Sequence, residues 1–180
     1  MEVWDLYDKN RQKTGLTMKK SESFPKGEYY SLRVNLCLFN KNGEMLIQQR
    51  HASKKHWPNL WDLTLSGGSV AGENSLDAIT REVYEELGLN LDFSKERPFF
   101  TINNGSSFND YYLIEKDVNL KKIKFQDGEV QAVKWASKEE ILKMIENKEF
   151  LLYYPSFIET IFEMSKNRGV LKPEGRLKKL

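Results

Sequence analysis

Residues 67–89, GGSVAGENSLDAITREVYEELGL, carry the most informative pattern in the chain. After a glycine-rich start, Asn74 or Ser75 can cap a helix, and Gly88 is a favourable C-terminal stop. At 100° per residue, four apolar side chains fall within about 80° of one another on that helix. They are Leu76, Ile79, Val83 and Leu87. The pattern predicts a helix that ends near Leu87 and docks this apolar stripe on a sheet.

The same stretch places three carboxylates beside the apolar stripe. Glu82, Glu85 and Glu86 occupy the adjoining sector, about 100° wide, and so lie at the border of the core. Glu85 and Glu86 also fall in the last turn, where the negative end of the helix dipole disfavours carboxylates. Arg81 can pair with one of the three, whereas a divalent hard cation can bind several carboxylate oxygens at once. Taken alone, the stretch fits either a metal site or a charged surface face.

The wider spacing is more specific. Nine positions follow a fixed order of glycine, glutamate, arginine and aliphatic residues: Gly67, Glu73, Arg81, Glu82, Val83, Glu85, Glu86, Gly88 and Leu89. Over its full length, this pattern resembles the signature of the Nudix hydrolase family. Its seven fixed residue types make a chance match on the order of one in a billion per start position.

The resemblance implies a loop–helix–loop that binds Mg²⁺ or Mn²⁺ and cleaves a diphosphate linked to another group. By position, Glu73 and Arg81 are implied as the pair that braces the loop against the helix. The implied metal ligands are the carboxylates of Glu82, Glu85 and Glu86 and the carbonyl of Gly67. A bound metal ion would lower the pKa of a water molecule that attacks phosphorus.

The residue that takes the proton of this water is less narrowly defined, because family members use different glutamates. Glu82 is one candidate, and Glu85 belongs to the same catalytic group. Glu129 is another, because its position six residues before Trp135 resembles that of an additional metal-binding glutamate in family members. The alternative for Glu129 is an ordinary surface glutamate at the start of a strand.

Residues 2–165 also resemble the branch of the family that includes isopentenyl diphosphate isomerases, so isomerisation is an alternative to hydrolysis. In those isomerases, a catalytic cysteine precedes the first glycine of the signature and a metal-binding histidine follows it. Here these positions hold Ser66 and Gly68, so hydrolysis is favoured. A third alternative is a module that binds diphosphates without catalysis, although such domains usually lack signature glutamates and none is missing here.

Cations shortly before the signature are expected to hold phosphates as charge-assisted donors: Arg50, Lys54 and Lys55. A solvated basic loop is an equal alternative. Trp57 and Trp61 can stack on the organic group of a substrate, but aromatic residues at such positions more often pack in the core. The expected partner is a small-molecule diphosphate, namely a nucleoside diphosphate derivative or a similar organic diphosphate.

At 180 residues, with 39% hydrophobic and 30% charged residues, the chain has the composition of a globular domain. Its net charge of +2 provides no field that would recruit nucleic acid or an anionic membrane, so neither is expected as a partner. No apolar run approaches the roughly 18 residues of a membrane span. Cys37 is the single cysteine, expected as a packed thiol, and the cytoplasm is the expected location.

Hydrophobic periodicity predicts strands within 3–20, 30–38, 44–50, 61–65, 98–103, 110–116 and 129–136. Gly15 is expected to supply the bend between the first two strands. Helices are predicted at about 74–87, from Ser137 to about Asn147, and from about 155 to before Gly169. Strands interrupted by amphipathic helices imply an α/β fold with a mixed sheet flanked by helices.

The family resemblance makes this fold a Nudix-type α/β/α sandwich with a short N-terminal β extension. Residues 1–168 are expected to form one domain, of which 1–28 are the extension. Residues 169–180 are expected to be a flexible basic tail. The N-terminal strands are the expected place for contacts if two subunits meet in a homodimer.

Overall fold

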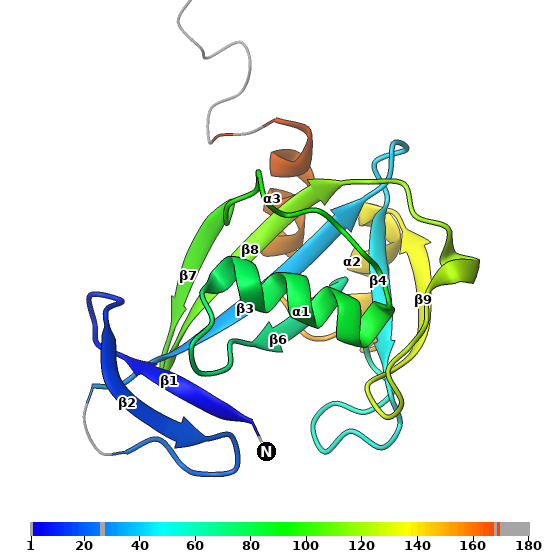
Figure 1. The fold of residues 1–180 in the computed structure, drawn as a ribbon. Coiled ribbons are helices and arrows are strands. Elements are labelled where there is room, and N and C mark those ends of the chain that lie inside the picture. The colour runs from blue at the N-terminus through cyan, green and yellow to red at the C-terminus, as the bar shows by residue number, and fades with distance from the viewer. Residues whose placement is uncertain (1, 26–27, 168, 170–180) are drawn as a thin grey trace, which may run out of the picture.

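The computed structural model describes residues 2–25, 28–167 and 169 (Figure 1). Two antiparallel strands, β1 (Val3–Tyr7) and β2 (Lys13–Lys19), form a separate hairpin. The other strands form one sheet: β3 (Ser31–Phe39), β4 (Met45–Arg50), β5 (Trp61–Asp62), β6 (Leu65–Gly68), β7 (Phe100–Asn104), β8 (Ser107–Glu115) and β9 (Val130–Ala136). The helices are α1 (Ser75–Leu87), α2 (Lys138–Glu146) and α3 (Pro155–Lys166), with a 3₁₀ turn at Leu120–Lys122.

Strand β3 lies at the centre of the sheet, and both of its faces are buried. Val34, Leu36 and Leu38 pack with the apolar stripe of α1. Cys37 and Phe39 face the other way and pack with residues of α2 and α3. Figure 1 shows α1 on one side of the sheet and α2 and α3 on the other. The expected α/β/α sandwich is therefore confirmed.

The sheet is mixed, because β3 runs parallel to β8 and antiparallel to β6. The single strand predicted at 61–65 is divided between β5, which pairs with β4, and β6, which pairs with β3. Thr64 bridges the division, since its hydroxyl accepts from the Leu38 N–H and donates to the Leu46 carbonyl. This division places β6, whose last two residues begin the signature, beside the central strand β3.

Helix α1 begins and ends as predicted. The Asn74 side chain accepts hydrogen bonds from the backbone N–H groups of Leu76 and Asp77, and the Asp77 carboxylate accepts from the Asn74 N–H, which completes a capping box. Gly88 ends the helix in the left-handed conformation, with φ of 62°. Ile79, Val83 and Leu87, on the face of α1 that packs against the sheet, are fully buried.

The bend between β1 and β2 does not lie at Gly15, which is part of β2. Instead, the Asp8 carboxylate accepts hydrogen bonds from the backbone N–H groups of Asn10 and Gln12, and Arg11 adopts a positive φ of 62°. A side-chain-capped turn of this kind needs no glycine. The expectation for Gly15 was wrong because a short acidic side chain already closes the turn.

This turn directs Arg11 toward the main sheet. Its guanidinium forms an ion pair with Asp110 of β8, which is completely buried, and donates to the Thr101 hydroxyl of β7. The Thr101 hydroxyl in turn donates to Asp110. These contacts therefore fasten the N-terminal hairpin to β8 and to the edge strand β7.

No helix in the described ranges is long and apolar enough to cross a membrane. The basic tail expected at 169–180 lies, apart from Gly169, outside the described residues.

Replacing Arg11 with Ala should lower the free energy of unfolding by about 2–3 kcal/mol, because Asp110 would keep a buried charge without its cation. Urea unfolding measures the change. Adding Asp110→Asn to Arg11→Ala should recover part of the loss, since it removes the charge. An Arg11→Ala variant as stable as the parent chain would contradict this role of the ion pair.

Candidate functional site

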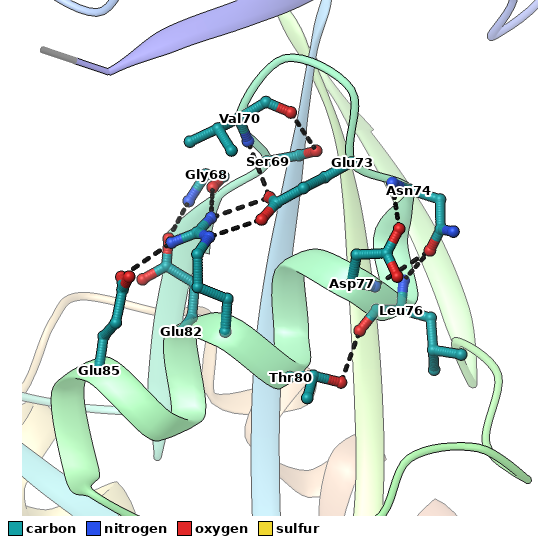
Figure 2. Close-up of polar contacts among 11 residues, drawn as sticks. Gly68, Ser69, Val70, Glu73, Asn74, Leu76, Asp77, Thr80, Glu82 and Glu85 are labelled. Carbon is teal, nitrogen blue, oxygen red and sulfur yellow. Dashed lines mark hydrogen bonds and ion pairs between the residues drawn. The ribbon is translucent and has the colours of Figure 1, made fainter.

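The guanidinium of Arg81 is the hub of the signature. Its partners include Glu73, Glu82 and Glu85, which are labelled in Figure 2. Its Nε and Nη2 donate to the two oxygens of Glu73 at 2.7 and 3.0 Å, and Nη2 also donates to the Gly68 carbonyl at 2.8 Å. Its Nη1 lies 3.1 Å from Glu82 and 3.0 Å from Glu85. The expectation that Arg81 pairs with one carboxylate was wrong, because a forked guanidinium can reach several acceptors at once.

Glu82 lies directly beneath the glycine pair of β6. Its Oε1 accepts a hydrogen bond from the Gly68 N–H at 3.2 Å. A Cβ atom added at Gly67 would lie 2.2 Å from the Glu82 Cδ, so only glycine leaves room for this carboxylate. Burial raises the pKa of Glu82, while the charge of Arg81 opposes the shift. The position of the Glu82 carboxylate therefore depends on the absence of a side chain at Gly67.

Glu86 carries the least balanced charge of the helix. It is 8% exposed, and burial raises its pKa to about 8, with further contributions from the charges of Glu82 and Glu129. Lys54 acts in the opposite direction. Its neighbour Glu85 is much more exposed and is held by Arg81. Glu86 is thus the carboxylate that an added cation would stabilise most.

Glu129 comes from a distant part of the chain, immediately before β9, and lines the same cleft as the helix carboxylates. Its carboxylate forms an ion pair with Lys54, and its carbonyl accepts from the His51 N–H. The structure therefore brings together one predicted catalytic glutamate and one predicted phosphate-binding lysine.

Arg50 also lines the cleft, but its guanidinium is engaged with the following loop. It donates to the carbonyls of His56 and Trp57 at 3.0 and 3.2 Å, and lies 3.8 Å from Asp62. Within the described part of the chain, Lys55 is not one of the residues that line this cleft. The three predicted phosphate-binding cations thus have different surroundings.

Asp62 is a cleft residue that sequence reasoning missed. It is buried and accepts hydrogen bonds from the Leu63 N–H and from the hydroxyl of Tyr153, which is far away in the sequence. Burial raises the pKa of Asp62 to about 6, although its hydrogen bonds and Arg50 oppose the shift. Neither Asp62 nor Tyr153 belongs to a recognisable sequence motif, so their hydrogen bond can be identified only from the fold.

The cleft has a volume of about 580 Å³ and is bounded by three kinds of surface. The signature carboxylates form one wall, and polar side chains of the sheet form another, among them Arg33, Asn35 and Asn109. Trp4 of the N-terminal hairpin and Trp57 of the loop before β5 complete it. Trp61 instead packs partly buried against the core under Lys134, as a packing residue would.

The donor set suits a hard divalent cation. Glu82, Glu85, Glu86 and Glu129 all line one cleft, and the Gly67 position leaves no room for a side chain beside Glu82. Across the described residues, no group of three or more histidine, cysteine, aspartate or glutamate side chains is drawn together closely enough to hold a metal. Arg81 lies between Glu82 and Glu85, so these side chains would have to turn toward a cation that entered.

Comparison with known proteins gives a consistent result. A family model described as the NUDIX domain matches residues 30–154. An uncharacterised Nudix hydrolase of Listeria innocua is 40% identical over 164 residues, which cover 91% of this chain and 95% of that protein. An isopentenyl-diphosphate Delta-isomerase of Pectobacterium atrosepticum is 36% identical over 97 residues, covering 54% of this chain and 51% of its own.

A solved structure from Deinococcus radiodurans shares the fold. It superposes with a TM-score of 0.70 at 24% identity and covers 90% of this chain and 98% of its own.

In protein stripped of divalent ions, thermal stability should fall as pH rises from about 5 to about 8. The folded chain keeps a proton on Glu86 up to a pKa of about 8, whereas the unfolded chain loses it near 4.5, so ionisation favours unfolding in that window. Asp62 acts in the same direction below about pH 6. The total loss should be on the order of 3 kcal/mol, measured by thermal melts across pH.

Glu86→Gln should flatten this dependence and melt higher than the parent chain at pH 8 without metal. Added Mg²⁺ should raise the melting temperature of the parent chain at pH 8 and have little effect on Glu86→Gln. An equal pH slope in both proteins would show that Glu86 does not carry the buried charge.

Proposed function

The chain belongs to the Nudix family, and from this premise we propose that it hydrolyses the diphosphate bond of an organic diphosphate with Mg²⁺ or Mn²⁺. The observation that carries the proposal is the convergence of four glutamates on one cleft beside a lysine: Glu82, Glu85, Glu86, Glu129 and Lys54. Two of the four, Glu82 and Glu86, are buried, and buried carboxylates are costly without a cation.

The metal would be held by the helix carboxylates, with Glu129 and the Gly67 carbonyl as further ligands. When bound, a divalent ion draws charge from the phosphate oxygens and lowers the pKa of a bound water. Lys54 is placed to release Glu129 and bind a phosphate oxygen as the diphosphate enters. The cleft thereby exchanges an internal ion pair for contacts with metal and substrate.

Glu82 is the best placed proton acceptor. It is buried, and the Gly68 N–H binds one of its oxygens, which orients the carboxylate. In the proposed reaction, the water oxygen bonds to phosphorus, its proton passes to Glu82, and the bridging P–O bond breaks. Glu85 and Glu129 contribute negative charge near the reacting phosphate, where they would help to hold the metal ion.

The organic group of the substrate has a suitable place beside the cleft. A second pocket of about 370 Å³ is lined by Trp57, Leu60, Leu151, Leu152 and Tyr153, three of which also line the cleft. Trp57 is 62% exposed and adopts a positive φ of 51°, a conformation that tryptophan rarely takes and that is common at functional sites. These features support a substrate with a flat or apolar organic group.

Isomerisation is the alternative, and the isomerase of Pectobacterium atrosepticum is the observation in its favour. Ser66 and Gly68 stand where the resemblance implies a catalytic cysteine and a metal-binding histidine. Cys37 does not replace that thiol, because it is fully buried in the core on β3 and burial raises its pKa strongly. Hydrolysis remains the better supported activity.

Incubation with Mg²⁺ and a panel of nucleoside diphosphates and triphosphates, nucleotide sugars, thiamine diphosphate and isopentenyl diphosphate tests the proposal. Phosphorus NMR should detect released phosphate or monophosphate from at least one compound. Glu85→Gln should lower kcat for that compound about 100-fold or more, because it removes a charge beside the reacting centre. Glu163→Gln, a matched change at an exposed side chain of α3, should leave kcat unchanged.

Formation of dimethylallyl diphosphate from isopentenyl diphosphate would overturn the proposal in favour of isomerisation. Binding without turnover of any compound would favour a non-catalytic module.

For the compound that is hydrolysed best, Trp57→Ala should raise KM about tenfold and leave kcat nearly unchanged, since the stacking surface is lost and the carboxylates are not. The same variant should scarcely affect hydrolysis of an analogue whose organic group is a single methyl. Equal effects on both compounds would contradict a role of Trp57 in selecting the organic group.

A further inference from the structure

The β1–β2 hairpin lies outside residues 30–154, the part of the chain that matches the NUDIX model, yet it contacts the signature directly. The Val3 carbonyl accepts a hydrogen bond from the Ala71 N–H at 2.7 Å, and the Asp5 carboxylate accepts from the Gly72 N–H at 2.8 Å. In Figure 1, β1 runs beside the loop that joins β6 to α1. The hairpin therefore holds the loop between β6 and α1 through hydrogen bonds to two of its backbone N–H groups.

Lys13 of β2 strengthens this support. Its ammonium lies 2.7 Å from Asp5 and donates to the Glu73 carbonyl at 3.0 Å. Because Glu73 in turn holds Arg81, the hairpin is joined to the hub of the site through one residue.

Trp4 makes the closest approach to the site. A Cβ atom added at Gly68 would lie 3.4 Å from three atoms of the Trp4 indole, which is ordinary van der Waals contact. Gly68 is also the residue whose N–H binds Glu82 and whose carbonyl accepts from Arg81. The indole thus packs against the peptide that aligns the buried carboxylate.

Trp4 has a second property that packing does not explain. Its indole nitrogen is closed off from solvent and has no hydrogen-bond partner among the described residues. A buried donor without an acceptor is unfavourable and is uncommon in native proteins. Trp4 lines the cleft together with Glu2 and Lys20, whose side chains form an ion pair at 2.7 Å. Because the donor is closed off in this conformation, a small movement of the surrounding side chains on ligand binding would have to expose it before an acceptor on the ligand could satisfy it.

We propose that the hairpin is a wall of the substrate site and that Trp4 is a substrate-binding residue, whose indole N–H donates to a phosphate oxygen of the bound diphosphate. This proposal rests on the proposed function, because it takes the cleft to bind a diphosphate. Phosphate oxygens are strong acceptors, and hydrogen bonds to charged groups are stronger than those between neutral groups. The ring itself keeps its contact with Gly68.

The test compares Trp4→Phe, which keeps an aromatic ring and loses the N–H, with the parent chain. For the compound hydrolysed best, Trp4→Phe should raise KM about tenfold while kcat changes less than about twofold. Leu16→Ala is the matched control, because Leu16 is exposed on the same hairpin and should leave both constants unchanged. An unchanged KM in a stably folded Trp4→Phe variant would overturn the proposal.

A binding measurement separates this proposal from the proposed function. In ¹⁵N-labelled protein, the indole N–H signal of Trp4 is the one of the four tryptophan signals that Trp4→Phe removes. Adding Mg²⁺ with methylene diphosphonate, which resists hydrolysis, should shift that signal downfield. A shift without hydrolysis of any compound would keep the Trp4 contact and reject the activity. Hydrolysis with an unmoved Trp4 signal would reject the contact and keep the activity.

Discussion

The site depends on one arginine that bonds to both the loop and the helix of the signature. The Arg81 side chain extends from α1 and donates to Glu73 and to the Gly68 carbonyl of the preceding segment, while it also forms ion pairs with Glu82 and Glu85. A lysine could supply the charge, but it lacks the planar fork that satisfies acceptors in fixed directions. The hydrogen bonds to Glu73 raise the pKa of Arg81 further, so the guanidinium stays charged at any pH the protein meets.

This arrangement leaves an electrostatic imbalance on the other side of the helix. Arg81 does not pair with Glu86, which is buried near Glu82, Glu129 and Asp62. The main positive charge that favours its ionised form is that of Lys54. The packed core beneath α1 holds these carboxylates in place, because the helix cannot rotate without exposing its apolar stripe. The folding energy of the core thus maintains a concentration of negative charge that isolated side chains would avoid. A divalent cation bound there, as proposed, would relieve that cost and would couple metal binding to stability.

Local features were predictable from the sequence, and long-range meetings were not. The caps of α1 and its apolar stripe follow from neighbouring residues, so the bounds of that helix matched. The division of 61–65 between two strands depends on Thr64 bonding to both β3 and β4, which no local pattern reveals. Residues 91 positions apart meet in the Asp62–Tyr153 hydrogen bond, and 99 positions separate Arg11 from Asp110. For such pairs, the order of the strands in the sheet must be known before the contact between the two side chains can be predicted.

The separation between local contacts within the signature and long-range contacts outside it explains how one signature can serve different substrates. Reaction chemistry depends on α1 and its loop, whose geometry is tightly constrained by Arg81 and by the glycine at position 67. The surfaces proposed to contact the substrate come from segments outside that unit, including the loop held by Arg50 and the segment around Tyr153, and Asp62 contacts both. These segments can change in sequence without moving the carboxylates, because they are anchored to each other rather than to α1. Selectivity can therefore vary while the catalytic geometry is retained.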